Sequence, residues 1–183
     1  DDSGKARLWF DKEYHHPMLL IPYRNPFGKI QACQIRFFGA DNHKQNRYLW
    51  LSLPSLGSAG NGTPLHFANR SGFGKNGMNF SVIVTEGALK ADTIVNFFPQ
   101  HIIIANSGVS CSHELIASTS LGRKVLVAFD NDYFNNPAVV RQLAKLIFKV
   151  SVDKSFPTVQ DKVSILSWNH KFKGIDDALL SNS

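Results

Sequence analysis

Short apolar runs alternate with amphipathic segments over the second half of this 183-residue chain, and this alternation constrains the fold more than any other feature. The runs are rich in β-branched residues, as expected of strands that are covered on both faces. They are Ser81 to Thr85, Ile102 to Ala105, Val125 to Phe129 and Val163 to Leu166.

Two of the intervening segments have apolar residues at three- and four-residue spacing, which predicts helices with one buried stripe. The stripes are Ala88, Ala91, Val95 and Phe98, then Val139, Leu143, Leu146 and Val150. Strands and helices that alternate in this way predict an α/β fold with a doubly wound parallel sheet and right-handed crossovers.

The first half has a different pattern, with strand-like runs joined by turns. Met18 to Tyr23, Ile30 to Phe38 and Arg47 to Leu53 predict a small antiparallel sheet. A stretch rich in Gly and Asn at residues 69–79 has no periodicity, and we expect the boundary there. The predicted domains are therefore a β-rich N-terminal subdomain, 1–78, and an α/β domain, 79–183.

Charge is unevenly divided between these domains. The chain has a net charge of +6, of which +5 belongs to residues 1–78. In that half cations alternate with aromatic residues, a composition typical of surfaces that bind single-stranded nucleic acid. The same alternation fits an ordinary strand with one solvated and one packed face. The candidate binding residues are Arg24, Arg36, Arg47, Tyr23 and Trp50.

Several classes of protein are not favoured. Apolar runs are too short to span a membrane, and the first residues lack the features of a signal peptide, so we expect a cytoplasmic protein without membrane contact. Cys33 and Cys111 lack partners at metal-ligand spacing, so neither a zinc ribbon nor a disulfide scaffold is expected.

Acidic residues follow three of the predicted strands. Glu86 comes after the first, Asp130 and Asp132 after the third, and Asp176 and Asp177 after the last. The carboxyl ends of parallel strands share one edge of a sheet, so the acids should converge there. Clustered carboxylates repel one another unless a cation lies between them, and oxygen ligands favour Mg²⁺ or Mn²⁺. Each acid alone could equally cap a helix or lie in solvent.

The segments that hold these acids resemble a known family. Val84-Thr85-Glu86-Gly87-Ala88-Leu89-Lys90, Ala128-Phe129-Asp130-Asn131-Asp132 and Lys173-Gly174-Ile175-Asp176-Asp177 are similar to the motifs of Toprim domains. The resemblance is strongest to primase-like Toprim modules of plasmid, phage and integrative-element replication proteins, and extends upstream over most of residues 15–68. It implies a Toprim (Rossmann-like) parallel sheet flanked by helices and preceded by a small β-rich subdomain.

The resemblance also implies roles for the matching residues. Glu86 would act as general acid or base or help to place metal, and Asp130 and Asp132 would bind magnesium or manganese. Asp176 and Asp177 resemble the acids that support a second metal in primases. Lys90 stands where replicative primases usually carry another acid, which places the second metal in question and makes Lys90 a candidate for binding nucleic acid.

The resemblance predicts a Mg-dependent primase-type module that joins nucleotides on single-stranded DNA, using Glu86, Asp130 and Asp132. A metal-dependent nuclease with the same acids and a non-catalytic binding or assembly module are the alternatives. Topoisomerase activity is not expected, since Phe134 stands where the topoisomerase triplet has its third acid. We also expect the chain to be a fragment whose parent carries a helicase or zinc-binding domain.

Overall fold

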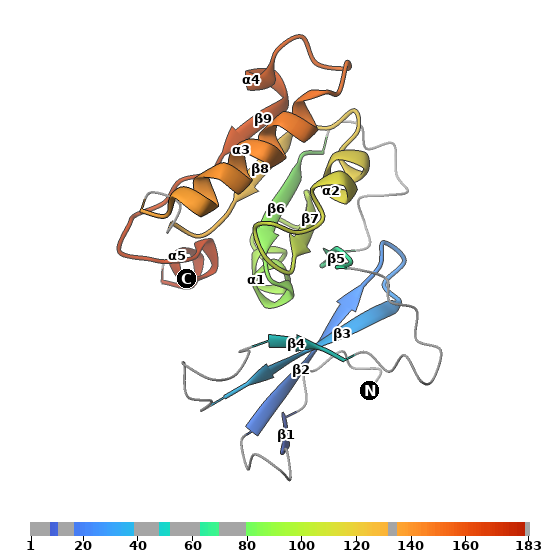
Figure 1. Ribbon diagram of the computed structural model, residues 1–183, viewed down its shortest axis with the longest axis vertical. Coiled ribbons are helices and arrows are strands. Elements are labelled where there is room, and N and C mark those ends of the chain that lie inside the picture. Colours follow the sequence, from blue (N-terminus) through green and yellow to red (C-terminus); the bar gives the residue numbers. More distant parts are fainter. Residues whose placement is uncertain are drawn as a thin grey trace.

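The computed structural model describes residues 8–10, 17–38, 48–51, 63–69, 80–131 and 135–181. Its strands form two sheets, a four-stranded antiparallel one and a five-stranded, mostly parallel one. Figure 1 shows the antiparallel sheet below and the α/β part above it. Among the described residues, none of the helices has the length and apolar composition needed to cross a membrane.

The antiparallel sheet has the strand order β1-β2-β3-β4. A hairpin joins β2 to β3, and Asn25 organises its turn, because its side-chain oxygen accepts the N–H groups of Phe27 and Lys29, both at 3.0 Å. Gly28 takes a positive φ of 77° in this turn. The predicted small antiparallel sheet is confirmed, with strands β1 (Leu8–Phe10), β2 (Pro17–Arg24), β3 (Ile30–Phe37) and β4 (Tyr48–Trp50).

The larger sheet has the order β5-β7-β6-β8-β9. Strands β6 to β9 pair in parallel, which confirms the predicted α/β fold class, and β5 adds to β7 in the antiparallel direction. The predicted boundary assigns β5 to the first domain, while the stretch around that boundary, residues 70–79, lies outside the described residues. The strands are β5 (His66–Phe67), β6 (Val82–Glu86), β7 (Ile102–Asn106), β8 (Val125–Ala128) and β9 (Val163–Ile165).

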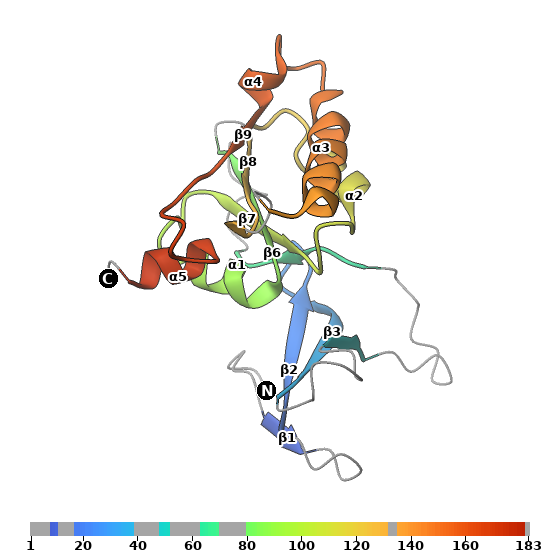
Figure 2. The same cartoon turned by 60° about the vertical axis from the view of Figure 1, so that its left-hand side comes forward.

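Helices cover both faces of this sheet (Figure 2). Side chains alternate along β6, so Val82 and Val84 face the core under α2 and α3, and Ile83 faces the core under α1 and α5. The predicted apolar stripe of the longest helix is confirmed, since all four of its residues are buried. The helices are α1 (Ala88–Ile94), α2 (His113–Thr119), α3 (Pro137–Ser151), α4 (Val159–Lys162) and α5 (Ile175–Leu180).

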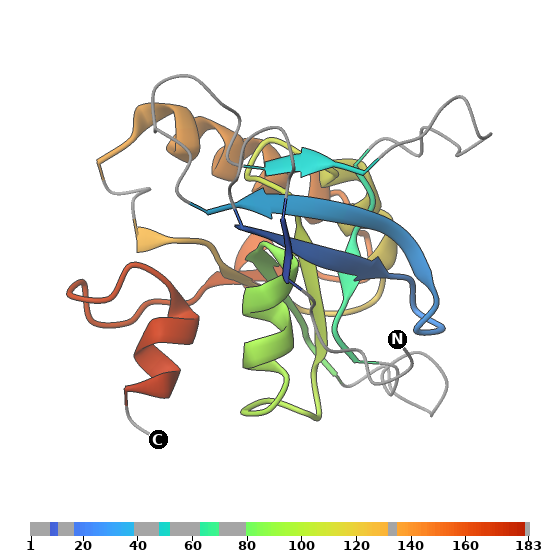
Figure 3. The ribbon, with the colours of Figure 1, turned by 90° about the horizontal axis from the view of Figure 1, so that it is seen from below.

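Helix α1 also packs against the antiparallel sheet. Ala88 forms a small core with Ile21 and Tyr23 of β2, and Figure 3 shows the hairpin of β2 and β3 beside α1. A buried histidine ties the same parts together: His66 Nδ1 accepts the N–H of Arg24 at 3.1 Å, so Nε2 carries the ring proton and donates to Asp92 Oδ1 at 2.9 Å. The two sheets therefore meet through α1 and β5.

Lys162 anchors the far end of the α/β part. Its buried ammonium donates to the carbonyls of Ser120 and Arg123, both at 2.6 Å, and to Asp153 Oδ2 at 2.7 Å. Burial by itself raises the pKa of Asp153, but hydrogen bonds, first that from Lys162 and then those from Ser155 and Gly122, outweigh it and hold the pKa below its usual range. Every donor of this lysine is thus engaged.

Replacing this lysine should destabilise the fold. Lys162→Met keeps an unbranched apolar stem but leaves Asp153 and two carbonyls without their donor, so we expect a loss of about 3–5 kcal/mol in the free energy of unfolding. Urea unfolding followed by circular dichroism measures the change. Lys154→Met, at an exposed lysine of the adjacent turn, is the control and should stay within about 0.5 kcal/mol. Equal effects of the two variants would contradict the assignment.

Candidate active site

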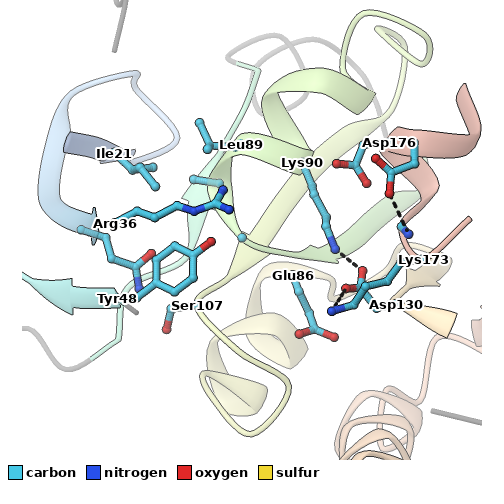
Figure 4. Close-up of a pocket in the computed structure, with 15 residues that line it drawn as sticks. Ile21, Arg36, Tyr48, Glu86, Leu89, Lys90, Ser107, Asp130, Lys173 and Asp176 are labelled. Atoms are coloured by element: carbon cyan, nitrogen blue, oxygen red, sulfur yellow. Dashed lines mark hydrogen bonds and ion pairs between the residues drawn. The ribbon is translucent and has the colours of Figure 1, made fainter. Parts of the chain in front are cut away.

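A cleft of about 370 Å³ lies where the antiparallel sheet meets the carboxyl edge of the parallel sheet (Figure 4). Both sheets contribute to its wall. The lining residues are Ile21, Gln34, Arg36, Tyr48, Glu86, Gly87, Ala88, Leu89, Lys90, Ser107, Asp130, Lys173, Gly174, Asp176 and Asp177. The structure therefore brings together four of the five acids singled out in the sequence.

Glu86 reaches the cleft because it is the last residue of β6. The chain then turns sharply into α1 through Gly87, which has a φ of 81° and donates its N–H to the Asn106 carbonyl at 2.7 Å. A residue with a Cβ is strained at this φ. The glycine thus lets α1 begin within two residues of the strand and leaves Glu86 at its edge.

Asp130 follows β8 and is already paired with two lysines. Lys90 Nζ donates to Asp130 Oδ1, and Lys173 Nζ lies 3.6 Å from Oδ2. The Asp130 carboxylate is 11% exposed and Lys90 22%, whereas the Lys173 side chain is 69% exposed. Lys90 therefore makes the shielded ion pair, and Lys173 makes a looser one at the mouth of the cleft.

Asp176 and Asp177 lie in the first turn of α5. Asp177 caps the helix, since its carboxylate accepts the N–H of Gly174 at 3.4 Å. Asp176 Oδ1 is buried and has no hydrogen-bond partner among the described residues. Burial raises the pKa of Asp176, and the charge of Lys90 acts in the opposite direction. Asp176 is thus held close to a cation without being bonded to it.

The opposite wall of the cleft carries a cation and an aromatic ring. Arg36 and Tyr48 are direct partners in the β3–β4 register, so their side chains share one face of the sheet. The Arg36 guanidinium lies 5.6 Å from the Tyr48 ring centroid and 5.2 Å from that of Phe38. The Tyr48 residue is 41% exposed, which leaves part of its ring available to a ligand.

Tyr23 cannot serve as a base-stacking residue, which corrects that prediction. It is fully buried, its hydroxyl donates to Gln34 Oε1 at 3.2 Å, and its ring contacts Trp50 at 4.7 Å between centroids. Burial also raises the pKa of its hydroxyl above the usual range. The physical reason is the alternation of β2, which points Ile21 and Tyr23 toward α1 rather than toward solvent.

Two further candidates lie away from the cleft wall. Trp50 is partly buried against the small core around Tyr23. The Arg24 guanidinium lies 3.7 Å from Asp92 Oδ2 on α1. The remaining candidates, Arg47 and Asp132, fall outside the described residues. Their predicted roles, like those of Trp50 and Arg24 in binding nucleic acid, stay predictions.

Glu86 and Asp130 are acids of the cleft with the chemistry of divalent-cation ligands. Among the described residues no three His, Cys, Asp or Glu side chains gather into a ready metal site. Mg²⁺, however, is usually held by one or two carboxylates together with water and substrate phosphates, and Glu86 and Asp130 are such a pair of oxygen donors. The chemistry of the donor set therefore fits one ion beside Glu86 and Asp130.

Two cleft residues were missed in the sequence. Tyr48 lies two positions before Trp50, on the same face as Arg36, and only the strand register shows that it is the ring at the cleft. Lys173 belongs to the segment that resembles a Toprim motif, but that resemblance assigns roles to its acids and none to the lysine. Its placement depends on Asn131, whose N–H and side-chain amide bond the carbonyls of Lys173 and Phe172, both at 2.9 Å.

Residues 75–183 match the family described as Domain of unknown function (DUF3854). This match covers more than half of the chain. The chain belongs to the DUF3854 family. No curated protein matches its sequence. The matched region of this DUF3854 protein holds all the acids of the cleft, while Arg36 and Tyr48 lie upstream of it.

Solved primase structures have the same fold as this DUF3854 chain. It is 20% identical to a DNA primase domain from Pseudomonas aeruginosa, with a TM-score of 0.59, covering 96% of this chain and 52% of that one. It is 14% identical to a DnaG primase catalytic domain bound to single-stranded DNA, with a TM-score of 0.60, covering 90% and 47% respectively.

A bacteriophage T7 complex also contains a chain that is similar in structure to this one. In it the lagging-strand DNA polymerase interacts with primase domains of two gp4 subunits bound to an RNA/DNA hybrid and dTTP. The match has 13% identity and a TM-score of 0.57, and covers 99% of this chain and 79% of that one. At these identities the likeness shows a shared fold. The DUF3854 chain spans about half the length of the Pseudomonas and DnaG chains.

The two tyrosines near the cleft should respond differently to truncation. Tyr23→Ala removes a fully buried ring, so we expect a loss of about 3–5 kcal/mol in the free energy of unfolding. Tyr48→Ala removes a partly exposed ring and should cost less than about 1 kcal/mol. Thermal and urea unfolding measure both. A stable Tyr23→Ala protein that loses only DNA affinity would restore Tyr23 as a binding residue.

Proposed function

We propose that this DUF3854 chain is a primase-type nucleotidyl transfer module that joins ribonucleotides on single-stranded DNA. One observation carries the proposal: a single cleft joins the acids of a parallel sheet edge to Arg36 and Tyr48 of the antiparallel sheet. The shared fold with primase catalytic domains supports it. Phosphoryl transfer needs acids that hold Mg²⁺, cations for phosphates and a surface for a template, and the cleft offers candidates for all three.

In the proposed reaction the 3′-hydroxyl oxygen of one nucleotide forms a bond to the α-phosphorus of an incoming nucleoside triphosphate. The bond from that phosphorus to its bridging oxygen breaks, and pyrophosphate leaves with the electron pair. Glu86 accepts the hydroxyl proton. Arg36 and Lys173 contact phosphate oxygens, and the exposed part of the Tyr48 ring stacks on a base.

Asp130 and Glu86, together with the predicted ligand Asp132, would hold Mg²⁺ or Mn²⁺. When bound, such an ion neutralises charge on the triphosphate and favours attack at phosphorus. Asp177 has a different task, since its carboxylate caps α5 and fixes the loop that carries Lys173. The resemblance of residues 15–68 further supports a parent replication protein of a mobile element, with a helicase or zinc-binding domain beside this module.

A non-catalytic binding module is the second candidate, and a specific contact favours it. Asp130 is already neutralised by Lys90 and Lys173, so the cleft can exist without any metal. Such a module would bind single-stranded DNA through Arg36 and Tyr48 and leave it unchanged. A nuclease would use the same acids with water in place of the 3′-hydroxyl, so the products distinguish the three functions.

The proposed role of Glu86 is tested by primer synthesis. The chain is incubated with single-stranded DNA, labelled ribonucleoside triphosphates and Mg²⁺ or Mn²⁺, and labelled oligoribonucleotides are expected. Glu86→Gln should lower their rate of formation by roughly 10²–10⁴-fold, because the variant cannot accept the proton and offers the metal a neutral oxygen in place of a carboxylate. Glu114→Gln, at an exposed glutamate on α2, is the matched control and should leave the rate unchanged. Shortened template would favour the nuclease, and unchanged template with no product the binding module.

The proposed template wall is tested by the salt dependence of binding. If Arg36 contacts a phosphate, Arg36→Gln should reduce the slope of log affinity against log salt for single-stranded DNA by about 0.7. Tyr48→Ala should instead cost about 1–3 kcal/mol at every salt concentration, with the slope unchanged. Arg141→Gln, at an exposed arginine on α3, is the control. An unaltered slope in a folded Arg36→Gln protein would remove Arg36 from the surface.

A further inference from the structure

Lys90 projects from the first turn of α1 into the group of acids (Figure 4). Its ammonium donates to Asp130 Oδ1 on one side. On the other side it lies 3.3 Å from the position that a Cβ on Gly174 would occupy, and the Asp176 carboxylate also meets that position. The Lys90 ammonium therefore stands between the end of β8 and the start of α5.

A positive charge at this position stabilises the carboxylates on either side of it. Asp176 Oδ1 is buried without a hydrogen-bond partner among the described residues, and Asp130 is 11% exposed. Two carboxylates that flank one small space repel each other unless positive charge separates them. Because Lys90 is itself mostly shielded, its charge acts through little solvent and is screened weakly by salt.

We infer that Lys90 replaces a second divalent cation, so that the cleft takes one Mg²⁺ or Mn²⁺ and uses the ammonium as its other fixed positive charge. The inference deepens the proposed function and rests on it for the identity of the bound ion. Asp176 then serves as a counter-charge to Lys90 rather than as a metal ligand, and Asp177 remains the cap of α5.

Lys173 has a different role from Lys90, although both lysines pair with Asp130. Its Nζ lies 3.6 Å from Asp130 Oδ2 and its side chain is 69% exposed, so its pairing with Asp130 is of the weak surface kind. A divalent ion can displace Lys173 from Oδ2 at little cost, whereas Lys90 remains on Oδ1. Lys173 is therefore the matched control: it pairs with the same carboxylate from the exposed side.

The number of bound metal ions tests the inference. Mn²⁺ is titrated into the full chain and counted by electron paramagnetic resonance of the free ion, with calorimetry as a second measurement. We expect one Mn²⁺ for the wild type and two for Lys90→Glu, which removes the ammonium and adds an oxygen ligand. Lys173→Met should keep one ion and bind it up to about fivefold more tightly, the most that a weak surface pair would oppose.

Circular dichroism checks that each variant is folded. If Lys90→Glu does not fold, Lys90→Met takes its place, and a second, weaker Mn²⁺ is expected because Asp130 and Asp176 lose their counter-charge. Two ions or none in the wild type would overturn the inference, as would a single ion in a folded Lys90 variant. The proposed function fails separately. A wild type that binds one Mn²⁺ yet forms no oligoribonucleotide would contradict primer synthesis and leave the inference about Lys90 intact.

Discussion

Packing of α1 between two sheets is the constraint on which the rest of the structure depends. Ala91 and Ile94 enter the core of the parallel sheet, while Ala88 contacts Ile21 and Tyr23 of the antiparallel sheet. Alanine at two of these positions lets the helix approach both sheets closely. The cleft lies beside this contact, since Ala88 and Ile21 belong both to its lining and to the small core.

Charge in the cleft is closely balanced. Its described lining carries four carboxylates, Glu86, Asp130, Asp176 and Asp177, against the three cations Arg36, Lys90 and Lys173. With all of them ionised the lining has one negative charge, which is unfavourable for a triphosphate. One divalent ion reverses the sign and makes the cleft attractive to an anionic ligand. Metal and nucleotide would therefore be expected to bind with positive linkage in the proposed function.

Much of this arrangement could be predicted from the sequence, because local pattern determines it. The β-branched runs and the apolar stripe of α3 predict the parallel sheet with its covering helix. The positions of Glu86 and Asp130 after two strands predict that both lie at one edge of that sheet. Helix α1 is shorter than its stripe suggested and ends at Ile94. The apolar stripe continues through Val95 and Phe98, whose N–H groups still bond the carbonyls of Ala91 and Ile94, both at 3.1 Å, although the segment after Ile94 is a series of turns. Pattern alone therefore does not mark the end of the helix.

What the sequence could not provide depends on long-range contacts. Tyr23 and Tyr48 are both aromatic residues in strands, and only the packing of β2 against α1 makes one core and the other cleft wall. The ion pair of Lys90 with Asp130 joins residues 40 positions apart. Strand β5 has only two residues, too few for any periodicity to indicate it.

That short strand has a consequence for how the protein can be divided. Strand β5 covers the edge of β7, whose five residues are all buried. Phe67 of β5 and Leu65, which precedes the strand, belong to the larger core. The region that matches the family begins at residue 75, after this strand. A protein cut to that region would present an apolar, unpaired strand edge, which is a template for edge-to-edge association. The upstream residues thus protect the parallel sheet from aggregation as well as completing the cleft.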